Sequence, residues 1–131
     1  MTTQALTEAS FEQTLLDNDI VLVDWWAAWC GPCRAFGPTF EKASAAHPDI
    51  VFGKVDTEAQ QSLAGSAGIT SIPTLMVFRA GILVLAQPGA LPASALEQVI
   101  ASVRALDMDD IRAQIAKSQA GAESQADAAA S

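Results

Sequence analysis

Residues 21–33 read VLVDWWAAWCGPC, and this stretch decides the fold. The run 20–27 presents two faces that are both apolar except at Asp24, which predicts a central β-strand covered on both sides. Apolar residues then recur every three to four positions, which predicts a helix over 32–47 that a following proline ends. The two cysteines of the stretch therefore lie where a buried strand passes into the start of a helix.

A thiol pair at the start of a helix is suited to thiol–disulfide exchange. The unpaired backbone N–H groups and the positive end of the helix dipole favour a thiolate at the first cysteine, Cys30. Cys33 lies one turn further into the helix, and we expect it to be less exposed. The sequence therefore predicts that Cys30 attacks a target disulfide and that Cys33 resolves the mixed disulfide that forms.

The residues alone leave other uses of the two cysteines open. A structural zinc site needs four ligands, and the single histidine, His47, cannot complete one within a chain, so we expect no metal. A purely structural disulfide would close a very small loop and stabilise the fold little. Two inert buried thiols are the third alternative, and the position of the pair favours the redox interpretation over all three.

Asp24 is unusual because its carboxylate must be desolvated wherever it points. Desolvation raises the pKa of a carboxyl group, and an acid that titrates near neutral pH beneath the cysteines could accept the proton of Cys33 when that thiol attacks. The alternative is a buried aspartate that caps a nearby backbone group. Lys54 lies on a strand that could bring its ammonium group towards Asp24, and a lysine that reaches to solvent is the competing interpretation.

Two further positions are candidates for the surroundings of the cysteines. Trp29 precedes Cys30 directly, and it is equally compatible with packing and with a docking surface. Pro73 follows Ile72 at the start of an apolar run, where a proline fits a cis turn that presents backbone groups beside the site.

The rest of the chain alternates between helical and extended patterns. The expected elements are helices over 8–17, 58–67 and 91–106 and strands over 50–56, 74–79 and 82–87. The last two strands are joined by Ala80 and Gly81, which predicts an antiparallel hairpin with a tight turn. This order of elements indicates an α/β sandwich on a mixed sheet.

The chain divides into one packed domain and an extension. Half of its 131 residues are apolar, which suits a single domain with a hydrophobic core, and we assign that domain to residues 1–106. The segment 107–131 is acidic and rich in alanine. It predicts a short helix over 107–117 followed by a disordered tail over 118–131, because that tail has no large apolar residue.

Charge and hydropathy limit the partners of the protein. Its formal net charge of −8 repels phosphate backbones and anionic lipid, so we expect neither nucleic-acid nor membrane-surface binding. The first twenty residues do not resemble a signal peptide, and no uncharged apolar run reaches the roughly 18 residues that span a bilayer. We therefore expect a cytoplasmic protein.

The motif residues together resemble the thioredoxin family over about residues 5–106. The likeness is carried by residues 21–33, Lys54-Val55-Asp56, Ile72-Pro73-Thr74 and Gly89-Ala90-Leu91. The resemblance implies the thioredoxin fold, a central mixed β-sheet flanked by helices on both faces. It also implies a monomer without a cofactor that reduces protein disulfides, serves cell redox homeostasis and is regenerated by a thioredoxin reductase.

The resemblance also implies a role for each site residue. Cys30 matches the nucleophile, Cys33 the resolving thiol, Asp24 the buried acid/base and Lys54 its charged neighbour. The docking surface implied for an extended substrate comprises Trp29, Gly31, Pro32, Ile72, the cis-proline Pro73 and Gly89. The segment 107–131 has no counterpart in short thioredoxins, and its role is unassigned.

Two other functions remain as alternatives to a disulfide reductase. Within redox chemistry, the protein could be an oxidant or isomerase of an extracytoplasmic compartment. From a different class, it could be a client-binding module or holdase on the same fold, with incidental redox activity.

Overall fold

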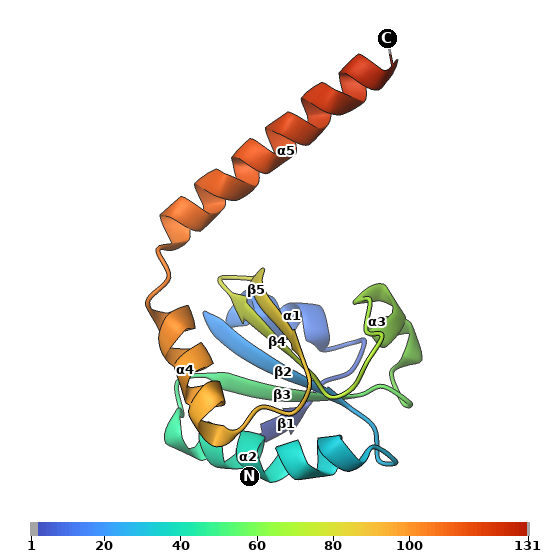
Figure 1. Ribbon diagram of the computed structural model, residues 1–131, viewed down its shortest axis with the longest axis vertical. Coiled ribbons are helices and arrows are strands. Elements are labelled where there is room, and N and C mark those ends of the chain that lie inside the picture. Colours follow the sequence, from blue (N-terminus) through green and yellow to red (C-terminus); the bar gives the residue numbers. More distant parts are fainter. Residues whose placement is uncertain (1–2, 131) are drawn as a thin grey trace.

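The computed structural model describes the backbone of residues 3–130 and the side chains of residues 3–119. Within this range, five strands form one mixed sheet with helices on both of its faces (Figure 1). In chain order the elements are β1 (Thr3–Ala5), α1 (Phe11–Asp17), β2 (Ile20–Trp26), α2 (Gly31–Ala46), β3 (Val51–Asp56), α3 (Gln61–Ser66), β4 (Thr74–Arg79), β5 (Ile82–Pro88), α4 (Ala93–Arg104) and α5 (Met108–Ala130).

The strand that leads to the cysteines is central, as predicted. The strand order is β1-β3-β2-β4-β5, in which β2 pairs parallel with β3 and antiparallel with β4. Every residue of β2 is buried except Trp26, which is partly exposed. The predicted hairpin of β4 and β5 is also confirmed, and the positive φ angles of Ala80 (52°) and Gly81 (79°) make its tight turn.

Alternate residues of the sheet build two separate cores. Val21, Val23 and Trp25 of β2 pack on the face that α1 and α3 cover, together with residues such as Phe11 and Leu63. Ile20 and Leu22 face the other way. They join the cluster beneath α2 and α4, which also contains Phe36, Phe40, Phe52, Leu96 and Ile100. Asp24 therefore lies, by the period of two along a strand, on the face that α2 covers.

Two helices begin three residues later than the sequence pattern suggests, and the helix expected over 91–106 covers only Ala93–Arg104. The predicted start of the first helix at residue 8 is wrong, because Ser10 and Phe11 N–H both donate to the Thr7 carbonyl in a turn that precedes α1. The third helix begins at Gln61 rather than at residue 58. Asp56 Oδ1 accepts hydrogen bonds from the next backbone N–H groups, and this turn keeps residues 57–59 out of α3.

The C-terminal segment differs most from the sequence-based expectation. The helix α5 covers 23 residues and leaves the body of the protein (Figure 1). The helix that the sequence predicted to end at residue 117 therefore continues to Ala130. Alanine, glutamine, glutamate and lysine are strong helix formers, so the lack of large apolar residues removes packing partners without removing helix propensity. The boundary between a domain over 1–106 and an extension over 107–131 stays a proposal.

Arg79 connects the sheet to the segment between the last two helices. Its Nη1 donates to the carbonyl oxygens of Val103, Arg104 and Leu106 at 2.7, 3.2 and 3.0 Å. These carbonyls lie at the end of α4, where a helix leaves most of its last carbonyls without a partner from a following turn. A charged side chain from β4 thus terminates α4 and holds the segment from which α5 begins.

We expect Arg79→Met to lower the free energy of unfolding by about 2 kcal/mol, because it removes hydrogen bonds from a charged donor and keeps the aliphatic stem. Urea unfolding measures the loss, and hydrogen exchange at residues 103–107 should accelerate. Arg112→Met is the matched control, since Arg112 is exposed and makes only a 3.5 Å pair with Asp109. Equal stability of the two variants would contradict this role of Arg79.

No helix in the described range 3–130 is both long enough and apolar enough to cross a membrane.

Candidate functional site

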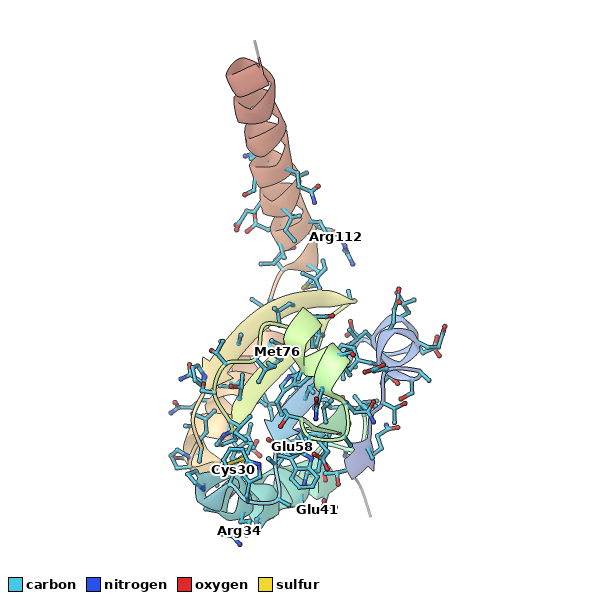
Figure 2. The ribbon with its side chains drawn as sticks, turned by 90° about the vertical axis from the view of Figure 1, so that its right-hand side faces the viewer. Cys30, Arg34, Glu41, Glu58, Met76 and Arg112 are labelled. Carbon is cyan, nitrogen blue, oxygen red and sulfur yellow. A yellow bond between two sulfur atoms is a disulfide. The ribbon has the colours of Figure 1, made fainter. Side chains whose placement is uncertain are left out.

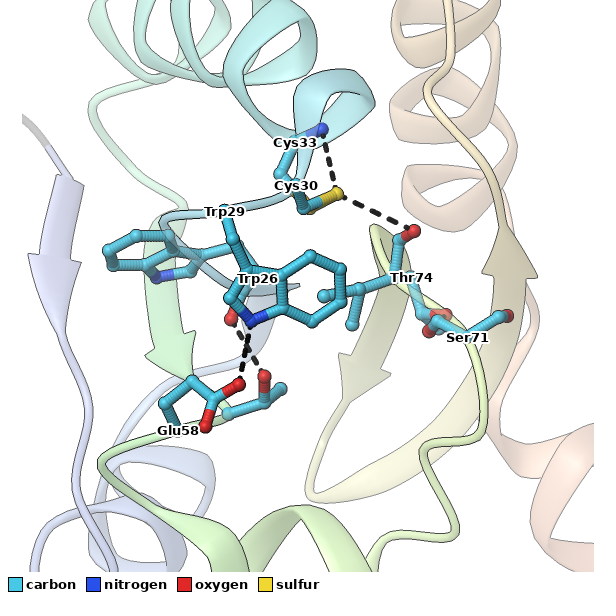
Figure 3. Close-up of a disulfide and its surroundings, with 9 residues drawn as sticks. Trp26, Trp29, Cys30, Cys33, Glu58, Ser71 and Thr74 are labelled. Atoms are coloured by element: carbon cyan, nitrogen blue, oxygen red, sulfur yellow. Dashed lines mark hydrogen bonds between the residues drawn. A yellow bond between two sulfur atoms is a disulfide. The ribbon is translucent and has the colours of Figure 1, made fainter.

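The two cysteines form a disulfide at the start of α2. Cys30 is the N-cap of the helix, its Cα lies 5.3 Å from that of Cys33, and its Sγ accepts a hydrogen bond from the Cys33 N–H at 3.2 Å (Figure 3). Each cysteine is only 4% exposed, so the expectation that Cys33 is the less exposed one is wrong for this disulfide form. The pair packs against Ala27, with Trp26 and Ile72 beside it.

The loop before β4 lies directly beside the disulfide. The Ile72–Pro73 peptide bond is cis, as predicted, and the Ile72 carbonyl oxygen lies 3.8 Å from Cys30 Sγ. The Gly89 N–H donates to the Pro73 carbonyl at 2.8 Å, which ties the loop after β5 to the same place. Gly89 has a φ of +96°, a conformation that only glycine adopts readily, so this residue type is required there.

Exposed residues surround the sulfur atoms on the solvent side. Trp29 is 68% exposed, and Gly31 and Pro32 are exposed as well. The indole Nε1 of Trp29 donates to Glu58 Oε1 at 2.6 Å, which holds the ring between Cys30 and Glu58 (Figure 3). Of the two interpretations of Trp29, packing and surface, the exposure of the ring favours the surface.

Asp24 is completely buried beneath α2. Neither of its carboxylate oxygens has a hydrogen-bond partner among residues 3–119, so the alternative of a backbone-capping aspartate is not what the structure contains. Burial raises the pKa of Asp24 from 3.8 to about 6, and the charge of Lys54 opposes that rise. The carboxyl group therefore titrates near neutral pH, as the sequence analysis expected.

Lys54 lies opposite Asp24 in the register of β3 and β2. Its Nζ lies 5.1 Å from the centre of the Trp26 ring, and a Cβ added to Gly37 of α2 would lie 3.9 Å from that Nζ. The ammonium group is therefore on the face that α2 covers, between the sheet and the helix. The structure places the lysine on the same face as the carboxylate and near enough for its charge to act on Asp24, but the two groups form no ion pair within residues 3–119. Lys54 is partly exposed, so its role as the charged neighbour of Asp24 stays a proposal.

Sequence reasoning overlooked Thr57 and Glu58. The backbone N–H and the Oγ1 of Thr57 both donate to the Trp26 carbonyl, at 2.9 and 3.0 Å, which joins the end of β2 to the loop after β3. A signal was available. Neighbouring parallel strands end at the same edge of a sheet. If β2 and β3 are recognised as parallel neighbours, the residues that follow β3 must lie near the residues that follow β2.

Within residues 3–119, no three side chains of His, Cys, Asp or Glu are close enough together to hold a metal ion. The chemistry of the site belongs to the sulfur pair, which can exist as a disulfide or as two thiols. A pair of this kind, at a helix start and bordered by exposed residues, defines a thiol–disulfide oxidoreductase.

Comparisons with known proteins identify the family. A family model described as thioredoxin matches residues 2–102. The chain is 58% identical over 120 residues to a protein named "Putative thioredoxin 2" from Streptomyces coelicolor, covering 92% of this chain and 90% of that one. It is 42% identical to thioredoxin from Porphyra purpurea, covering 76% and 95%. A solved thioredoxin of Plasmodium falciparum superposes with a TM-score of 0.72 at 36% identity, covering 76% of this chain and 98% of that one.

The chain therefore belongs to the thioredoxin family. It is a protein-disulfide reductase that uses the Cys30–Cys33 pair as its redox centre and disulfide-containing proteins as its substrates. The thioredoxin fold predicted from the sequence is confirmed, with a five-stranded mixed sheet and flanking helices.

Proposed function

We propose that Cys30 is the nucleophile of this reductase and Cys33 the resolving thiol. The observation that carries this assignment is the hydrogen bond from the Cys33 N–H to Cys30 Sγ at the helix N-cap. A backbone donor and the helix dipole both favour negative charge on that sulfur, and they act on Cys30 rather than on Cys33.

The exchange then runs in two steps. The Cys30 thiolate attacks a target disulfide, which forms a mixed disulfide and releases one target thiolate. Cys33 loses its proton and attacks Cys30 Sγ, which closes the Cys30–Cys33 disulfide and releases the second target thiolate. The dithiol loses two electrons, and the target disulfide gains them.

Asp24 is the group that we assign to accept the proton of Cys33, directly or through water. Its burial beneath α2, its lack of hydrogen-bond partners within residues 3–119 and its pKa of about 6 support this role. Lys54 is a positioning residue whose charge keeps part of the carboxyl population ionised near neutral pH. Without that lysine, desolvation would favour the protonated acid, which cannot take up another proton.

The docking surface that we propose surrounds Cys30. It comprises Trp29, Gly31, Pro32, Ile72, Pro73 and Gly89. Their arrangement around the disulfide supports this surface, and the Ile72 carbonyl oxygen lies 3.8 Å from Cys30 Sγ. An extended target segment would lie across Ile72 and form backbone hydrogen bonds there.

We also propose that a thioredoxin reductase regenerates the dithiol form of this protein. The protein would act in the cytoplasm as a monomer. The test is a coupled assay in which NADPH and a thioredoxin reductase drive the reduction of a protein disulfide through this chain. We expect turnover that depends on this protein. We also expect a Cys30–Cys33 reduction potential near the roughly −270 mV that is typical of thioredoxins.

The coupled assay and the potential separate the alternatives. A potential above about −200 mV would indicate an oxidant or isomerase instead. A normal potential without turnover by any thioredoxin reductase would contradict only the proposed electron donor.

A further inference from the structure

We propose that Glu58 makes this reductase prefer targets that carry a basic residue next to the disulfide. The inference deepens the proposed function, because it rests on the docking surface around Cys30. It concerns a charged group that is hydrogen-bonded to an exposed side chain of that surface, the Glu58 carboxylate held by Trp29 (Figure 3).

Glu58 is held in place by several contacts. The Trp29 indole binds its carboxylate at 2.6 Å, and Asp56 Oδ1 accepts from its backbone N–H at 2.9 Å. The preceding residue, Thr57, is itself tied twice to the Trp26 carbonyl. Because both the backbone and the carboxylate are fixed, less side-chain entropy is lost when a cation binds there than for an ordinary surface glutamate.

The indole N–H fills only part of the hydrogen-bonding capacity of the Glu58 carboxylate. An ionised carboxylate offers about four acceptor positions, and Trp29 N–H uses one of them. Glu58 is exposed, so a lysine or arginine of a docked target can approach the others. The other residues of the docking surface are uncharged. Lys54, four residues before Glu58 in the chain, directs its ammonium group to the Trp26 ring beneath α2. Arg34 lies in the first turn of α2, apart from Glu58 (Figure 2).

The expected preference is modest, because an exposed ion pair contributes little in water. Values of about 0.2 to 1 kcal/mol for such pairs correspond to a rate ratio of about 1.4- to fivefold between basic and neutral targets. The ratio should shrink as salt rises, since screening acts within about 10 Å at 0.1 M ionic strength.

The test uses three synthetic disulfide peptides that differ only at the two residues flanking one cysteine, with Lys, Ala or Glu there. The full-length protein is first reduced with a small dithiol and freed of it. Single-turnover rate constants are then measured by tryptophan fluorescence in a stopped-flow instrument. For each variant we divide the rate constant for the Lys peptide by the rate constant for the Glu peptide. The intrinsic reactivities of the two peptides are the same in every variant, so a change of this Lys-to-Glu ratio between variants reports on the protein.

Glu58→Gln is the decisive variant, since a glutamine can still accept from the Trp29 indole but has no charge. Glu12→Gln makes the same charge change on the exposed surface of α1 and is the matched control. We expect Glu58→Gln to lower the Lys-to-Glu ratio by about two- to fivefold, or more if both flanking positions contribute, and Glu12→Gln to leave the ratio as in the wild type.

A merely structural role of Glu58 would change all three rates together and leave the ratio unaltered, and that result would overturn the proposal. An equal fall of the ratio in Glu12→Gln would overturn it too, because net charge would then be the cause. If none of the peptides were reduced by any variant, the proposed attack by Cys30 would fail as well. A change of ratio confined to Glu58→Gln supports the proposal.

Discussion

A Cys33→Ser protein is expected to stop after the first step and to remain covalently attached to its target. Cys30 can still attack a disulfide in this variant, but no second thiol is present to release the product. Cys30→Ser lacks the attacking sulfur altogether, so we expect it to lose reductase activity by at least about three orders of magnitude. Mass spectrometry after mixing each variant with an oxidised target distinguishes the two outcomes.

The contrast between the two variants is what tests the assignment. The exposures of the two cysteines are equal, so the assignment rests on the surroundings of Cys30 Sγ at the helix start. Covalent capture by Cys30→Ser instead of Cys33→Ser would reverse the roles. Capture of the same target by a protein with both cysteines changed to serine would show that binding does not need the redox pair, as the client-binding alternative requires.

Asp24→Asn should stabilise the disulfide form of the protein at neutral pH. Burial raises the pKa of Asp24 from 3.8 to about 6, so the folded protein holds this proton more tightly than the unfolded chain. The contribution of Asp24 to stability is complete below about pH 3.8 and is lost as the pH rises through about 6. The loss amounts to about 3 kcal/mol, of which about 2 kcal/mol falls between about pH 4.5 and 7.5.

Urea unfolding of both proteins across this pH range measures the effect. The difference in free energy of unfolding, variant minus wild type, should grow by about 2 kcal/mol from about pH 4.5 to 7.5. Asp17→Asn, at the exposed end of α1, is the control for removing an acid at the surface. A difference that stays flat with pH would show that the carboxyl group of Asp24 titrates normally.

The same variant tests the catalytic role of Asp24. If this carboxylate accepts the proton of Cys33, Asp24→Asn should slow the release of target from the mixed disulfide by about a hundredfold and leave the first attack by Cys30 less affected. If Asp24→Asn is more stable than the wild type but releases its target at the wild-type rate, Asp24 takes no part in the proton transfer.

Patterns among residues that are close in sequence predicted much of the fold. The apolar run of β2, the helical period of α2 and the Ala80-Gly81 turn between β4 and β5 each involve neighbours along the chain, and all three predictions are confirmed. The cysteine pair was recognised for the same reason, since its chemistry depends on its position at a strand-to-helix junction. The cis bond at Pro73 was also predicted, but mainly through the resemblance to the thioredoxin family.

The errors arose where a local pattern had two solutions. The run over 58–67 suits a helix, yet the carboxylate of Asp56 binds the next N–H groups and delays the start of α3. The tail beyond residue 118 lacks core residues but keeps high helix propensity, and α5 follows propensity. The first competition depends on which hydrogen-bond acceptor is within reach, whereas the second was open to the propensities of the residues themselves.

The sequence by itself determined the central strand, the helix that carries the redox pair and the chemistry of two thiols at its start. Only the tertiary structure decided the strand order, and with it that Lys54 lies opposite Asp24, that Glu58 holds Trp29 and that Arg79 ends α4. The physical reason is the range of the interactions. Periodicity and caps act over a few residues, whereas backbone hydrogen bonds pair β2 with β3 and with β4 across thirty to about sixty positions of the chain.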